Sequence, residues 1–146
     1  MIDAMLKDSV LRPHLFIWRG ALPMPAIESW EREQSLCAPS DLKQLWNAKG
    51  GGDIFESETI LQPFGAPDYD LIGSVSRVFW ARGLSTTYCV FHTGLWDSIF
   101  RKSDGALFSI MSKDLTQLSM WQDLDDWYGS LRQEYAERYD LGRSVR

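Results

Sequence analysis

The sequence predicts an α+β fold in which helices pack against one antiparallel β-sheet. Three observations lead to this class. Apolar residues recur at helical spacing through much of the first 83 residues, the following thirty or so residues change to β-rich segments with short turns, and the chain then returns to a long amphipathic helix. With 146 residues, no internal repeat and short loops, the chain is expected to form a single domain over residues 1–146.

The first elements are short. Residues 1–12 are expected to form a brief helix, and the apolar run at 14–20 a strand or a buried extended segment. Pro25 is suited to be the first residue of the next helix, because its fixed φ matches the helix and its missing N–H is not needed there. Ile27 and Trp30 follow at helical spacing.

A second helix is predicted from the segment "APSDLKQLW". Ser40 is a suitable N-cap, and Leu42, Leu45 and Trp46 lie on one apolar face. The helix then reaches the three glycines at 50–52, which are typical of a helix end.

One or two strands are expected in "DIFESETIL", followed by a loop in which Asp68 or Asp70 could cap a helix that ends at Gly83. A meander of three strands follows at about 86–92, 96–102 and 106–112, with a turn at "SDG". A capping box of Ser119 and Gln122 then suggests the start of the last helix. Its apolar stripe consists of Leu124, Trp127, Tyr128, Leu131 and Tyr135.

The net charge of −5 bears on possible partners. An acidic surface repels phosphate backbones, so nucleic-acid binding is not expected. The same charge suits a basic protein partner, although it could serve solubility alone. The N-terminus lacks the pattern of a signal peptide, no apolar run is long enough to span a membrane, and the two Cys make no disulfide framework, so we expect a cytoplasmic protein.

No catalytic, metal or cofactor site is predicted. The glycines at 50–52 follow a helix and precede acids, which is the wrong order for a phosphate loop. His14 and His92 have no partner at metal-ligand spacing, and His92 is expected to be structural. A small enzyme stays an alternative that would need His92, Cys89 and an acid to converge in a pocket.

The three acids at 123, 125 and 126 have two possible roles. They can complement the dipole of the last helix, or two of them could form an acid pair in a cleft. The first interpretation explains all three without a cleft.

The order of several residues resembles the SUKH superfamily, which includes fungal cell-wall synthesis regulators and many bacterial immunity proteins. The pattern consists of Ile27, Glu31, Pro39, Asp41, Leu42, Leu45, Trp46, Gly50 and Gly51. The chain departs from the family pattern at Gln34, Ser35, Ala38 and Lys49. The resemblance implies an α+β fold in which this unit leads into an antiparallel sheet, and it extends from about Ile27 to about Tyr139. Residues 1–25 lie outside it and are expected to be a subfamily-specific N-terminal extension.

The resemblance implies a binding protein rather than an enzyme. Bacterial members are similar to antitoxins that neutralise one cognate toxin in the cytoplasm, often a nuclease-type toxin. An acidic inhibitor would be steered towards a basic toxin. The candidate contact residues are Asp53, Glu56, Glu58, Asp68 and Asp70. The alternative is a regulatory or scaffolding module with several partners, against which we count the lack of disordered flanks. The oligomeric state is not predicted.

Overall fold

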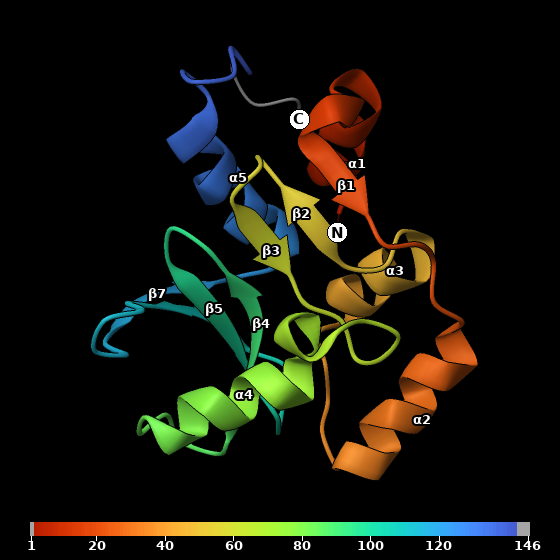
Figure 1. The fold of residues 1–146 in the computed structure, drawn as a ribbon, viewed down its shortest axis with the longest axis vertical. Coiled ribbons are helices and arrows are strands. Elements are labelled where there is room, and N and C mark those ends of the chain that lie inside the picture. Colours follow the sequence, from red (N-terminus) through yellow and green to blue (C-terminus); the bar gives the residue numbers. More distant parts are fainter. Residues whose placement is uncertain (1, 143–146) are drawn as a thin grey trace.

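The computed structural model describes residues 2–142, and within them seven strands form one antiparallel sheet in chain order (Figure 1). The strands are β1 (Phe16–Trp18), β2 (Gly52–Ile54), β3 (Glu58–Ile60), β4 (Tyr88–Thr93), β5 (Asp97–Arg101), β6 (Leu107–Ile110) and β7 (Gln117–Trp121). The helices are α1 (Asp3–Leu11), α2 (Met24–Gln34), α3 (Ser40–Ala48), α4 (Ile72–Ala81) and α5 (Leu124–Tyr135), with 3-10 turns η1 (Pro13–Leu15) and η2 (Asp68–Asp70). The predicted α+β class and the three-strand meander are confirmed. Residue 1 and residues 143–146 of the predicted domain lie outside the described part.

The N-terminal segment is built into the domain. Strand β1 pairs with β2 and forms one edge of the sheet, with Ile17 opposite Asp53. Helix α1 packs against α5, and Met5 of α1 is completely buried in the core. Whatever its relation to a family pattern, the described part of the expected extension therefore contributes to both the sheet and the core.

The turn between α2 and α3 is held by one glutamate. Glu31 accepts hydrogen bonds from the backbone N–H of Ala38 at 2.8 Å and from the Lys43 ammonium at 3.0 Å. Pro39 is the N-cap residue of α3, so the prediction that Ser40 caps this helix is wrong. Ser40 is the first helical residue, and Pro39 fits the extended backbone that precedes a helix.

Helix α3 forms the centre of the core. Its apolar face of Leu42, Leu45 and Trp46 has no exposed surface. The Trp46 indole N–H donates to the carbonyl of Leu61 at 2.9 Å, so the ring is satisfied as well as buried. Asp41 accepts a hydrogen bond from the backbone N–H of Leu124 at 2.8 Å and so joins α3 to the N-terminus of α5.

The glycines at 50–52 allow three stretches of backbone to approach closely. A Cβ at Gly50 would lie 2.2 Å from the carbonyl oxygen of Gly20, and one at Gly51 would lie 2.4 Å from that of Ile60. Gly50 also has a φ of 79°. These contacts confirm that the glycines form the turn from a helix into a strand.

The last helix begins later than a capping box at Ser119 would place it. Ser119 lies in β7, a strand that the sequence interpretation missed. Asp123 is the N-cap, accepting from the backbone N–H of Asp126 at 2.8 Å, and the Asp126 carboxylate accepts from that of Gln122 at 3.0 Å. Two of the three acids at the start of α5, Asp123 and Asp126, therefore cap this helix. The backbone turn η2 intervenes before α4, and neither Asp68 nor Asp70 caps that helix.

Candidate functional site

The outer face of β1, β2 and β3 places an exposed apolar residue, Ile17, next to Asp53, one of the predicted contact acids. Residues directly opposite one another in a sheet share a face, so the register aligns Ile17, Asp53, Thr59 and Thr93 in one row. Ile17 is 67% exposed, Asp53 is exposed, and the two threonines are half-buried. The Thr59 hydroxyl donates to the Asp53 carboxylate at 2.9 Å. We call these four residues the outer row.

No helix is drawn in front of β2 and β3 in Figure 1, and α5 passes behind them. The sheet residues that point the other way are buried, including Ile54, Glu58 and Ile60. A half-sheet with one packed and one solvated face is common in antiparallel sheets. An exposed isoleucine beside an exposed carboxylate is suited to a protein contact that combines apolar burial with charge.

The turn η2 lies next to this face. Arg19 follows β1 and forms an ion pair with Asp70, which brings η2 to the end of the strand. Asp68 and Tyr69 of the same turn are exposed, and Tyr69 retains 73% of its surface. A tyrosine with this exposure is the kind of residue that anchors protein interfaces.

The five predicted contact acids do not all face solvent. Asp53, Glu56 and Asp68 are exposed, whereas Glu58 is 1% and Asp70 8% exposed. Glu58 must be removed from the contact surface because the period of the strand turns it to the inner face. Asp70 must also be removed, since Arg19 pairs with it.

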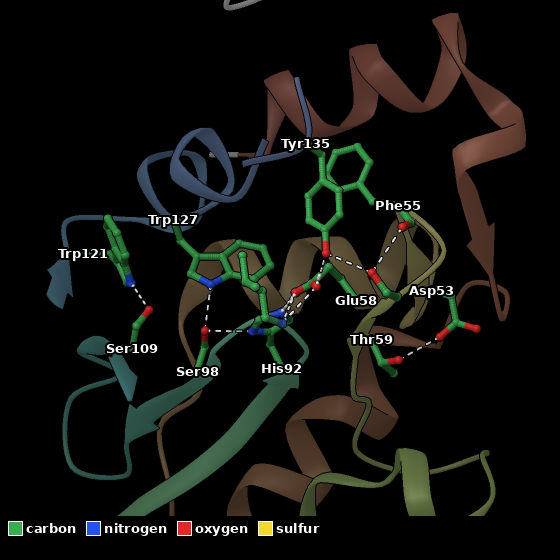
Figure 2. A network of polar contacts seen from close by, with 12 residues as sticks. Asp53, Phe55, Glu58, Thr59, His92, Ser98, Ser109, Trp121, Trp127 and Tyr135 are labelled. Carbon is green, nitrogen blue, oxygen red and sulfur yellow. Dashed lines mark hydrogen bonds and ion pairs between the residues drawn. The ribbon is translucent and has the colours of Figure 1, made fainter. Parts of the chain in front are cut away.

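Glu58 instead belongs to a buried chain of hydrogen bonds under α5 (Figure 2). His92 Nε2 lies 2.8 Å from the Glu58 carboxylate, and His92 Nδ1 lies 2.9 Å from the Ser98 hydroxyl. The Trp127 indole N–H donates to Ser98 at 2.8 Å. One tautomer satisfies every member: Ser98 donates to Nδ1, and Nε2–H donates to Glu58.

The Glu58 carboxylate is also held from two other sides. The Tyr135 hydroxyl donates to it at 2.5 Å, and the backbone N–H of Leu95 at 3.0 Å. A Cβ at Gly94 would lie 2.0 Å from this carboxylate, so only glycine leaves it room. Burial raises the pKa of Glu58, but the hydrogen bonds from His92, Tyr135 and Leu95 outweigh it, and the pKa lies below its ordinary value.

The hydrogen-bond network of Glu58, His92 and Ser98 has the contacts of a serine–histidine–acid relay, but it is closed off from solvent. Ser98 and His92 have no exposed surface, and Ser98 already accepts the Trp127 indole N–H. A relay needs its hydroxyl within reach of a substrate. Cys89 does not join the group: it lies near Ser76 and Lys102, and burial raises the pKa of its thiol. The arrangement ties β3, β4 and β5 to α5, as expected for a structural His92.

Residues 2–142 contain neither a metal-binding group of side chains nor a membrane-spanning helix. No group of three or more His, Cys, Asp or Glu side chains there is arranged to hold a metal ion. No helix in that range has the length and apolar character needed to cross a membrane. All seven tryptophans are buried or half-buried, so none is a fully exposed anchor.

Sequence reasoning missed the outer row because its four residues come from four different strands. Only the pairing of those strands places the residues side by side. Ile17 looked like one residue of a buried apolar run, and only its pairing with Asp53 shows that it faces outward. Searches against protein-family models and against curated proteins find no match to this chain.

Proposed function

We propose that this protein is an immunity-type binding protein that neutralises a basic toxin in the cytoplasm, without catalysis. The observation that carries the proposal is the outer row, where exposed Ile17 and Asp53 lie side by side on a sheet face without a covering helix. The resemblance to the SUKH superfamily supplies the class of partner.

The residues that carry the resemblance have structural roles in this protein. Ile27, Leu42, Leu45 and Trp46 are completely buried, and Glu31, Asp41, Gly50 and Gly51 hold turns or close backbone contacts. They build the scaffold and leave the binding surface to residues outside the pattern. Such a scaffold suits a family in which each member recognises a different partner.

Charge supports a basic partner. Asp53, Glu56 and Asp68 are exposed, and the chain carries a net charge of −5. Complementary charge accelerates encounter, and a basic enzyme that binds phosphate would be attracted to this protein. Ile17 and Tyr69 supply the apolar and aromatic contact that charge alone does not.

Growth rescue tests the proposal. Toxin candidates encoded beside this protein in its native genome are expressed with the wild-type protein, with Asp53→Lys, or with Ile17→Lys. The wild type is expected to restore growth against one candidate, and both variants are expected to fail. Glu33→Lys is the matched control for Asp53→Lys, because Glu33 is exposed on α2 and its reversal changes the net charge by the same amount. Failure of the wild type against every candidate would contradict the proposal.

A further inference from the structure

A cleft between α2 and α4 differs in charge from the rest of the molecule. Its volume is about 230 Å³, and its walls include Trp30 of α2, Arg77 and Trp80 of α4, and Lys102 beyond β5. The chain holds 20 acids and 15 Lys and Arg, yet none of the described acids lines this cleft. It is therefore a local basic site on an acidic protein.

Neither cation of the cleft is paired with a carboxylate among residues 2–142. The side chain of Arg77 is exposed and forms no hydrogen bond or ion pair with any other residue in the described part of the chain. The Lys102 ammonium lies 4.5 Å from the centre of the Trp80 ring and has no ion pair with another described residue. Some other cations of the chain do form ion pairs with carboxylates, as Lys43 does with Glu31.

The walls are held in place by contacts outside the cleft. The Trp80 indole N–H donates to the carbonyl of Tyr88 at 2.8 Å. Trp30 packs edge-on against Trp46, with ring centres 5.8 Å apart. The backbone N–H of Lys102 donates to Thr87 at 2.8 Å. A site whose walls are fixed in advance loses little freedom when a ligand enters.

The first turn of α4 adds to the positive character. Gly73 and Ser74 line the cleft, and they belong to the helix end that carries partial positive charge. No side chain caps this helix end. The turn therefore reinforces the two cations without itself defining the site.

We propose that this cleft binds a small planar carboxylate. A guanidinium and an ammonium recognise a carboxylate, and two indoles favour a flat apolar group beside it. Its volume lies below the range of about 300–1,000 Å³ that is typical of drug-sized ligands, so the ligand is of fragment size. The site is separate from the outer row and does not depend on the proposed toxin partner.

The test uses benzoate as the probe and benzamide as its neutral counterpart. Binding is followed by the indole N–H signals of Trp30 and Trp80 in two-dimensional NMR spectra. Benzoate is expected to shift both signals saturably, with a dissociation constant on the order of 1 mM, whereas benzamide binds at least about tenfold more weakly. Arg77→Gln and Lys102→Gln are each expected to weaken benzoate binding on the order of tenfold.

Lys113→Gln is the matched control, since Lys113 is exposed, does not line the cleft, and its loss changes the net charge equally. Unchanged benzoate affinity in this control supports the site. The proposal is overturned if benzoate causes no saturable shift, if benzamide binds equally well, or if Lys113→Gln weakens binding as much as Arg77→Gln does. Arg77→Gln keeps the test informative should Lys102→Gln disturb the fold.

Discussion

Asp8 and Arg132, which are 124 residues apart in the chain, form a buried ion pair with an Nε–oxygen distance of 2.6 Å. Asp8 has no exposed surface and also accepts a hydrogen bond from the Tyr128 hydroxyl at 2.6 Å. Arg132 in turn donates to the carbonyl of Leu141 at 2.7 Å. The first helix is therefore fastened to the last by charge as well as by packing.

Removing the Asp8 charge should destabilise the domain strongly. Asp8→Asn takes the Asp8 carboxylate away from the buried Arg132 guanidinium, and breaking a buried ion pair in this way typically costs about 3–5 kcal/mol of unfolding free energy. Urea denaturation measures the change. Lys7→Gln on the same helix is exposed and should stay within about 0.5 kcal/mol of the wild type. Equal stability of the two variants would mean that the N-terminal helix contributes little to the fold.

Glu58 should make stability depend on pH in acid. Its folded pKa lies below the ordinary value of 4.5, so its contribution is fully present above that value and is lost as pH falls through the folded pKa. Glu58→Gln should cost about 2 kcal/mol at neutral pH and should flatten the acid limb of the stability curve. Thermal unfolding between pH 7 and pH 3 measures both effects.

Glu56→Gln is the control for that experiment, because Glu56 lies in the same hairpin but is exposed. It should leave stability within about 0.5 kcal/mol of the wild type. A wild type and a Glu58→Gln variant that lose stability in parallel on acidification would refute the role assigned to this carboxylate.

The glycine turn gives a steric prediction. An alanine Cβ at position 51 would lie 2.4 Å from the carbonyl oxygen of Ile60, so Gly51→Ala must push two strands apart. We expect a loss of at least about 2 kcal/mol. Gly73→Ala is the comparison, because its nearest neighbour would be the flexible tip of Arg77 at 4.0 Å and it lies inside α4. It should be neutral or stabilising by up to about 1 kcal/mol. Denaturant midpoints distinguish the two.

The exposed acids among the predicted contact residues should control how fast the partner binds. Changing Asp53, Glu56 and Asp68 together to their amides removes three exposed charges without removing a core contact. With an identified basic toxin, the association rate at low salt should fall about tenfold, and the difference should shrink at high salt. Stopped-flow measurements at two salt concentrations test this. An unchanged rate at low salt would exclude these three acids as the steering surface.

Local patterns in the sequence were enough for most elements of the fold. The spacing of Leu42, Leu45 and Trp46 identified α3, and the glycines that follow marked its end because the signals for both lie within a few residues. Strand β7 was missed because Ser119 and Gln122 were interpreted as a capping box, and because its apolar residues Leu118 and Met120 face solvent at the sheet edge, where the register also shifts. Edge strands depend on pairing that a local pattern does not contain.

The candidate surface was predictable only in part. Asp53 was identified from its place in an acidic stretch, but the same reasoning included Glu58, whose carboxylate is buried by contacts with His92 and Tyr135 that are distant in the chain. Sequence proximity could not separate the two because the strand period turns them to opposite faces. The exposed position of Ile17 likewise depends on the sheet register rather than on its apolar neighbours.

Affinity capture from the native host is the most direct test of the proposed binding function. Tagged wild-type protein, the Asp53→Lys variant and the Glu33→Lys control are compared, and the captured complexes are characterised by mass spectrometry and by their stoichiometry. The account predicts that the wild type and Glu33→Lys retain one basic toxic enzyme in a stoichiometric complex that inhibits it, and that Asp53→Lys loses it. Recovery of no toxic enzyme by the wild type, or equal retention by Asp53→Lys, would contradict the account.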